Sequence, residues 1–123
     1  CKWLAEIIHS NPAWINSRVA DQRGIRDGDA IRVTSRLGSI VTRAYVTQGI
    51  HPRVIAISDN CGHWQFGRVA QAQRFRSPDP ETMLIWWGKE GNGVHPNPII
   101  PAASDPIGGG QAWMDTVVTI TKI

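Results

Sequence analysis

Cysteine is scarce in this sequence, and long apolar runs and runs of one charge are missing. Two cysteines, Cys1 and Cys61, are too few for a framework of disulfide bonds. No apolar stretch approaches the ~20 residues of a membrane-spanning helix, so direct membrane insertion is not expected. No secretory signal peptide is recognisable. The net charge of +3 comes without a basic run or an RNA-binding motif, so nucleic acid is not an expected partner.

What the sequence does contain fits one β-rich domain. A length of 123 residues and a hydrophobic fraction of 41% suit a single domain with a modest core. The 13 basic residues only slightly outnumber the 10 acidic ones, which suits an anionic ligand such as a phosphate. Six tryptophans are many for this length, and they predict either core packing or a surface that meets a flat ligand or another domain.

Local patterns predict a short helix and then a hairpin. Asn16 or Ser17 can cap a helix that continues to Arg23, with Gly24 just after its end. Alternating apolar residues then predict strands near 31–34 and 40–46, paired antiparallel across glycine-centred turns that tolerate positive φ. The GIRDGD segment between helix and hairpin lacks the spacing and the lysine of a phosphate-binding loop, so we interpret it as structural.

Further strands are predicted at residues 13–15, at the β-branched run 54–57 and at the alternating segment 113–123. Long segments rich in Gly, Pro and polar residues separate them, near 58–81 and 88–110. About six short strands, one or two short helices and two long loops favour a closed or nearly closed β-barrel with functional loops.

The order of these motifs resembles a known family. The first motif is CKWLAEIIHSNPAWIN, which precedes the predicted helix and GIRDGDAIRVTSRLG. The motifs that follow are VTQGIHPRVIAIS with CGHW, then GVHPNPIIPAASDPIGG, then a last strand. This order is similar to the C-terminal molybdopterin-dinucleotide-binding domain of the dimethyl-sulfoxide-reductase family. Within that family, the sequence most resembles the catalytic subunits of the polysulfide, thiosulfate, tetrathionate and arsenate reductase type. The resemblance covers nearly all of residues 1–123 and implies a mainly β fold, a double-psi β-barrel.

The resemblance also implies a role and partners. Such a domain covers one side of a bis(molybdopterin guanine dinucleotide) cofactor that carries molybdenum or tungsten. The metal-ligating side chain, and a 4Fe-4S cluster where one is present, belong to earlier domains of the same catalytic polypeptide. Further implied partners are an iron–sulfur electron-transfer subunit, together with a membrane anchor subunit. We therefore expect residues 1–123 to be a C-terminal fragment of a larger oxidoreductase polypeptide that lacks its first strand and is not active alone.

Asn97 and His95, in GVHPNPII, are the first candidate cofactor-binding residues. The Asn that matches Asn97 in the family contacts the pterin, whose edge presents donors and acceptors, as an amide does. On the sequence alone Asn97 also reads as a loop residue that bonds its own backbone beside Pro98. His95 reads equally as part of the same cavity or as a packing residue. Asp105 reads as a turn former in the following loop.

The CGHW segment, residues 61–64, follows a predicted strand end and is a second candidate site. Gly62 allows close backbone approach, His63 can donate to a phosphate or pterin, and Trp64 can stack on a ring. Cys61, the first residue of this segment, is also a candidate cofactor-binding residue. The alternative is that Trp64 is a core residue and His63 a hydrogen-bonded polar one. A structural zinc site lacks the required ligands.

Lys2 and Trp113 complete the candidate set. Lys2 can approach a phosphate as a point charge, and Trp113 begins the last strand near the implied cofactor, although either reads also as an ordinary surface or core residue. Asn11 most simply ends the segment before Pro12. The competing hypothesis for the whole chain is a non-enzymatic β-barrel binding or adaptor module, because a fold does not fix a function.

Overall fold

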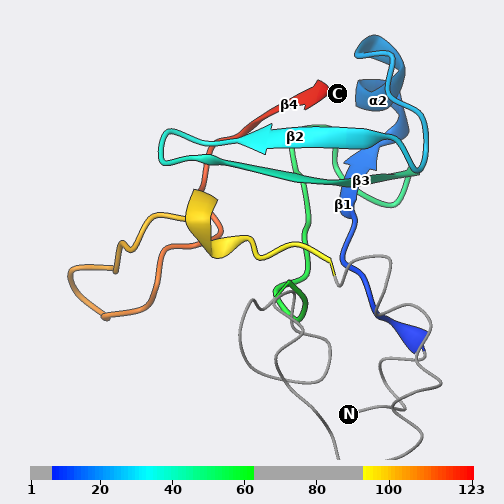
Figure 1. Cartoon of the computed structure of the whole chain (residues 1–123). Coiled ribbons are helices and arrows are strands. Elements are labelled where there is room, and N and C mark those ends of the chain that lie inside the picture. The colour runs from blue at the N-terminus through cyan, green and yellow to red at the C-terminus, as the bar shows by residue number, and fades with distance from the viewer. Residues whose placement is uncertain (1–6, 63–92) are drawn as a thin grey trace, which may run out of the picture.

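The computed structural model describes residues 7–62 and 93–123. Within them the elements are β1 (Ala13–Asn16), α2 (Ser17–Gln22), β2 (Ala30–Thr34), β3 (Ser39–Thr47), the short 3-10 helix η3 (Asn97–Ile99) and β4 (Thr119–Lys122). The strands form one curled sheet in the order β1-β3-β2-β4, half of a barrel, with long segments beneath it (Figure 1). The mainly β fold with short helical pieces that the sequence predicted is confirmed.

The sheet combines parallel and antiparallel pairs. β1 pairs in parallel with β3, with Ala13 opposite Ala44, and α2 and β2 lie between the two strands in the sequence. β2 pairs antiparallel with β3 on one side and with β4 on the other. In β1 the side chains alternate as predicted for a strand, because Ala13 and Ile15 are buried while Trp14 is exposed beside Tyr45.

The helix α2 is fixed at both ends by local chemistry. The Asn16 side chain accepts a hydrogen bond from the Arg18 backbone N–H at 3.0 Å, so Asn16 is the N-cap. Gly24 follows the helix with φ of 63°, and the next amide, that of Ile25, donates back to the Ala20 carbonyl. Both ends agree with the sequence prediction.

The β2–β3 hairpin is also as predicted, but one of its glycines has a different function. Gly28 has φ of 80°, as expected for the turn that enters β2. Gly38 is not among the glycines with positive φ; instead, a Cβ there would lie 3.3 Å from the Pro98 carbonyl oxygen. Gly38 therefore lets η3 approach the hairpin closely, rather than supplying an unusual backbone conformation.

The GIRDGD segment is structural, as we interpreted it. The Asp27 carboxylate accepts the Val46 backbone N–H at 2.8 Å, which ties the segment to β3. Asp29 accepts the Arg26 amide and forms an ion pair with Lys122 of β4. These contacts, led by the Lys122 hydrogen bond, hold the pKa of Asp29 below its ordinary value.

The core lies on the concave side of the sheet. Ile15, Ile31 and Val33 are its largest fully buried side chains, one from β1 and two from β2. Ile99 of η3 and Ile120 of β4 belong to the same buried cluster, so the hydrophobic effect joins the helix and the last strand to the hairpin.

Two predicted strands are shorter than expected. Residues 54–57 form only one isolated bridge, in which Ala56 exchanges two backbone hydrogen bonds with Trp14. The last strand begins at Thr119 instead of residue 113. Residues from both segments instead line one cavity, and residues 54–57 lack a strand partner beyond the bridge at Ala56, as strand formation requires.

Candidate functional site

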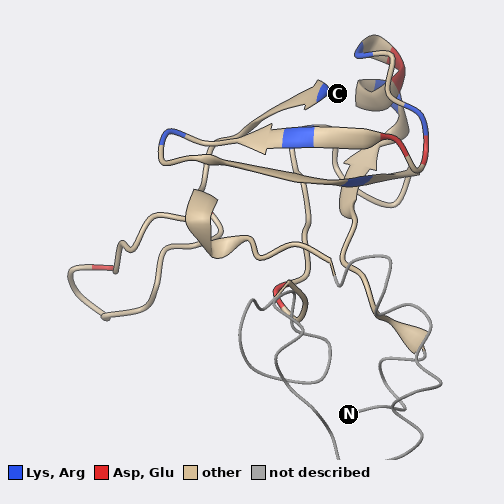
Figure 2. Cartoon of the chain, in the orientation of Figure 1, with Lys and Arg blue, Asp and Glu red and all other residues tan. Residues whose placement is uncertain are grey.

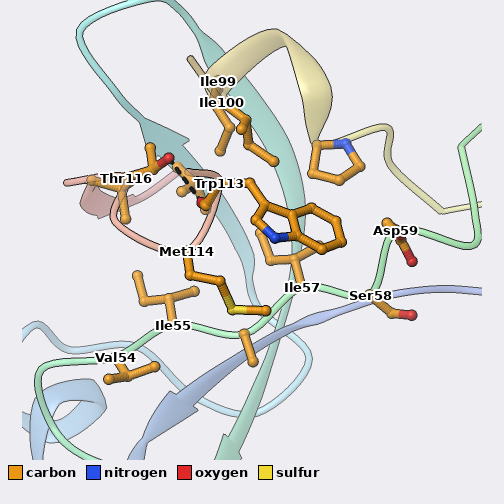
Figure 3. Close-up of a pocket in the computed structure, with 14 residues that line it drawn as sticks. Val54, Ile55, Ile57, Ser58, Asp59, Ile99, Ile100, Trp113, Met114 and Thr116 are labelled. Carbon is orange, nitrogen blue, oxygen red and sulfur yellow. Dashed lines mark hydrogen bonds between the residues drawn. The ribbon is translucent and has the colours of Figure 1, made fainter. Parts of the chain in front are cut away.

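Three segments that are distant in the sequence enclose a cavity of about 440 Å³ under the sheet (Figure 3). They are residues 54–59, residues 96–100 around η3, and residues 113–118 before β4. The lining consists of Val33, Val54, Ile55, Ala56, Ile57, Ser58, Asp59, Pro96, Ile99, Ile100, Trp113, Met114, Thr116 and Val118. The two loops and the last segment that the sequence singled out therefore meet at one place.

The lining is mostly apolar and contains one large aromatic ring. The Trp113 side chain is 44% exposed, and its carbonyl oxygen accepts a hydrogen bond from the Thr116 hydroxyl at 3.1 Å. Figure 3 shows the indole among Ile57, Ile100 and Met114. Ser58, Asp59 and Thr116 add polar side chains to the indole N–H of Trp113, and this mostly apolar lining suits a flat ring with a few hydrogen-bonding groups more than a bare phosphate.

Positive charge lies mainly elsewhere in the described residues. Figure 2 shows Lys and Arg on β2 and β3 and around α2. The sequence from residue 93 to residue 118 contains no Lys or Arg, and none lines the cavity. Neutralisation of a phosphate in this cavity would therefore depend on backbone N–H groups or on groups outside the described residues.

Of the predicted site residues, Trp113 lines the cavity directly. Asn97 is exposed and begins η3, where its carbonyl accepts the Ile100 amide at 3.0 Å. His95 is half-buried. These two residues flank Pro96, which is part of the lining, but neither of them is itself part of it. Lys2, His63 and Trp64 lie outside the described residues.

Cys61 and Gly62 lie where the segment 58–62 contacts the segment 93–95. Cys61 is buried, and this burial raises the pKa of its thiol. Gly62 has φ of 78°, and a Cβ on it would lie 2.1 Å from the Val94 carbonyl carbon. The close approach that we expected at Gly62 is therefore an approach to the chain's own backbone at residues 94 and 95.

Asp105 forms a turn, as predicted. Its carboxylate accepts the backbone amides of Ile107 at 3.1 Å and Gly108 at 2.9 Å. These two hydrogen bonds lower the pKa of Asp105. It does not line the cavity, and its bonds organise the loop that leads from η3 toward Trp113.

The sequence did not predict a role for Asn11 in the candidate site. Asn11 is 2% exposed, and its amide nitrogen donates to the carbonyl oxygens of Ser58 and Val94, while its oxygen accepts the Val94 amide. Asn11 thus connects the two loops on either side of the cavity. Its partners lie 47 and 83 residues away, and no local pattern predicts such bonds.

Two general features are absent from the described residues. These residues contain no group of three or more His, Cys, Asp or Glu side chains able to hold a metal ion. Within residues 7–62 and 93–123, no helix has the length and apolar character needed to cross a membrane.

The chain is similar in sequence to subunits of known reductases. The chain is 30% identical over 132 residues to a selenate reductase subunit of Mesobacillus selenatarsenatis, covering 89% of this chain and 12% of that protein. It is 32% identical over 99 residues to the molybdopterin-containing subunit of the arsenate respiratory reductase of Chrysiogenes arsenatis, covering 80% of this chain and 10% of that protein.

A solved structure has the same fold. Acetylene hydratase from Pelobacter acetylenicus superposes with a TM-score of 0.61 at 16% identity, over 98% of this chain and 15% of that one. The chain thus spans only a small part of each of these relatives. The family described as the molydopterin dinucleotide binding domain matches residues 2–117. The chain therefore belongs to the molydopterin dinucleotide-binding domain family.

Proposed function

We propose that this chain is the cofactor-binding domain of the catalytic subunit of a molybdenum or tungsten oxidoreductase that uses bis(molybdopterin guanine dinucleotide). The observation that carries the proposal is the cavity at which residues 54–59, 96–100 and 113–118 meet. The relatives that cover most of the chain are reductase subunits. The substrate is a small inorganic or organic molecule, and activity requires the rest of the polypeptide.

The cavity fits the ring part of such a cofactor. Its volume of about 440 Å³ lies within the usual ~300 to 1,000 Å³ of small-molecule sites. The Trp113 ring offers a flat apolar surface and an indole N–H, and the Asn97 amide beside the cavity offers a donor and an acceptor. The phosphates require donors beyond this lining, and Lys2 is one candidate.

Each candidate site residue has its own role in this proposal. Asn97 binds the pterin edge, with His95 beside it, and Trp113 forms an apolar wall. Cys61 and Gly62 pack the two loops together. His63 and Trp64, which lie outside the described residues, remain proposed ligand contacts. When bound, the cofactor supplies two-electron redox chemistry at its metal, and the residues of this chain bind and orient it.

The partners in this proposal are mainly the remaining domains of the same polypeptide. A 4Fe-4S cluster in an N-terminal domain and an iron–sulfur electron-transfer subunit, together with a membrane anchor subunit, would complete the electron path. No direct contact with nucleic acid or with the bilayer is proposed for this domain.

The test uses the full-length protein purified from its native host. Bound molybdenum and tungsten are measured by elemental analysis, and GMP is measured after acid hydrolysis. Metal together with GMP supports the proposal. A folded protein with neither, from cells able to make the cofactor, contradicts it and favours the β-barrel adaptor module.

Variants then test the cavity itself. Trp113→Ala and Asn97→Ala should each lower the GMP content of the purified protein. Val117→Ala is the matched control, because Val117 is 86% exposed and lies outside the lining. Equal GMP in all three variants would contradict the placement of the ligand at this cavity.

A further inference from the structure

Asn11 is the one buried polar side chain of the described core, and it lies two residues before β1. Burial of a polar group is costly unless its hydrogen bonds are made. Asn11 makes them with backbone groups of two other segments. Its backbone carbonyl also accepts the Thr42 hydroxyl of β3 at 3.3 Å.

The carboxamide forms a reciprocal pair with Val94. The Asn11 Oδ1 accepts the Val94 amide at 2.7 Å, and the Asn11 Nδ2 donates to the Val94 carbonyl at 2.7 Å. The second N–H of the same nitrogen is directed to the Ser58 carbonyl. Only a primary amide combines two donors and an acceptor in this way, so neither a carboxylate nor a hydroxyl can replace it fully.

The segments around Asn11 approach one another so closely that only glycine fits at two positions. A Cβ on Gly93 would lie 2.2 Å from the Asn11 Oδ1 and 2.7 Å from the Cys61 Cβ. A Cβ on Gly62 would lie 2.1 Å from the Val94 carbonyl carbon. The segments 58–62 and 93–95 are thus in direct contact, with the Asn11 amide between them.

Both joined segments continue into the walls of the cavity. Ser58 lines the cavity at the end of one segment, and Pro96 lines it just after the other. We propose that Asn11 is a positioning residue, which fixes the distance between these two walls and thereby retains the ligand. This inference rests on the proposed function for the identity of that ligand, the molybdopterin dinucleotide.

The experiment uses Asn11→Ala and Asn11→Asp in the full-length protein. Hydrogen exchange read by mass spectrometry reports opening of residues 58–62 and 93–97, and GMP released over time reports cofactor loss. In both variants, exchange in these segments should rise at least about tenfold, because buried partners lose their hydrogen bonds. Cofactor release should accelerate by a similar factor.

The aspartate variant separates hydrogen bonding from shape. Asp has the size of Asn and keeps the acceptor for the Val94 amide, but its carboxylate faces the two carbonyl oxygens of Ser58 and Val94 without a donor. Asn11→Asp should therefore be no better than Asn11→Ala. Wild-type exchange and cofactor retention in Asn11→Asp would overturn the proposal.

Asn16→Ala is the matched control. Asn16 is the last residue of β1, its amide donates to the Ile50 carbonyl at 2.7 Å, and neither Asn16 nor Ile50 is part of the cavity lining. It should loosen α2 and leave cofactor release unchanged. If Asn11→Ala and Asn16→Ala release cofactor at the same rate, Asn11 is merely structural and the positioning role is wrong.

The two proposals fail in different ways. A wild-type protein without metal or GMP overturns the proposed function, and the exchange at residues 58–62 and 93–97 then still decides whether Asn11 fixes the two walls. Wild-type exchange in those segments in Asn11→Ala overturns the positioning role whatever the protein contains.

Discussion

Gly62 and Gly109 have similar backbone conformations but different surroundings. Their φ angles are 78° and 71°. A Cβ on Gly62 would meet the Val94 backbone, whereas a Cβ on Gly109 would have no neighbour within 4 Å. A side chain at residue 62 would therefore cause both backbone strain and a steric clash, whereas a side chain at residue 109 would cause backbone strain alone.

We predict that Gly62→Ala lowers the free energy of opening of residues 93–97 by more than about 2 kcal/mol. Gly109→Ala should lower local stability by only about 1 to 2 kcal/mol, which is the cost of a left-handed residue with a side chain. Hydrogen exchange on the full-length protein measures both. Equal effects would mean that the loop at Val94 relaxes freely around a Cβ at residue 62.

A second residue-scale prediction concerns Asp105. The amides of Ile107 and Gly108 lower its pKa in the folded state below the ordinary value of 3.8. Its stabilising effect is therefore complete above that ordinary value and is lost as the pH falls through the lowered, folded-state pKa.

Exchange of the Ile107 and Gly108 amides, corrected for intrinsic rates, should accordingly rise as the pH falls below about 4. Asp105→Ala should show fast exchange there at every pH. A pH response that persists in the alanine variant would assign the effect to another group.

At the scale of elements, Arg23 joins α2 to the edge of the sheet. Its guanidinium donates to the Ile120 carbonyl of β4 at 2.9 Å, and Figure 1 shows α2 beside the end of that strand. β2 pairs with one side of β4, so the other side of β4 is an edge of the sheet. The contact with Arg23 occupies a carbonyl on this edge, which could otherwise pair with another chain.

Arg23→Ala should increase exchange in β4, at a cost of about 1 kcal/mol because Arg23 is exposed, and leave the β2–β3 hairpin unchanged. Arg18→Ala is the control, since Arg18 is an exposed residue of α2, the helix that Arg23 caps, and its side chain forms no hydrogen bond or ion pair with any described residue. Equal exchange in the two variants would show that the contact contributes nothing.

The elements that the sequence predicted correctly are fixed by neighbouring residues. Asn16 caps the helix that follows it, Gly24 ends that helix, and residues 31–34 and 40–46 pair across a short turn. Residues 54–57 have an equally strong strand composition but pair only at Ala56, since strand formation there depends on a partner that the sequence does not specify.

The candidate site could be predicted only in outline. The motifs pointed to the segments that meet at the cavity, and Trp113 is part of its lining. The Gly62 contact with Val94 and the Asn11 bonds depend on tertiary packing, which leaves no periodicity in the sequence. The ligand contacts of Asn97, His95, His63, Trp64 and Lys2 stay predictions.

At the scale of the whole molecule, the proposed function divides the domain into a paired sheet and a set of loops that the cofactor would stabilise. Removal of the cofactor from the full-length protein should increase exchange in residues 54–59, 96–100 and 113–118, because a ligand stabilises only the state that it binds. β2 and β3 should change little, since backbone pairing and the buried Ile31 and Val33 hold them. A uniform increase over the whole domain would contradict this division.

The Asn11 bonds also have a consequence for the order of folding. The β2–β3 hairpin closes a short loop, whereas the bonds from Asn11 to Ser58 and Val94 close loops of 47 and 83 residues. Longer loops carry a larger closure entropy, and contacts across them form later. We therefore expect the two walls of the cavity to be assembled after β1, β2 and β3 have paired, at a late stage that also includes β4, because Thr119 of β4 pairs with the distant Thr34 of β2. A newly made chain would then pass through a stage in which β1, β2 and β3 are paired and the cavity is still open to a bulky dinucleotide.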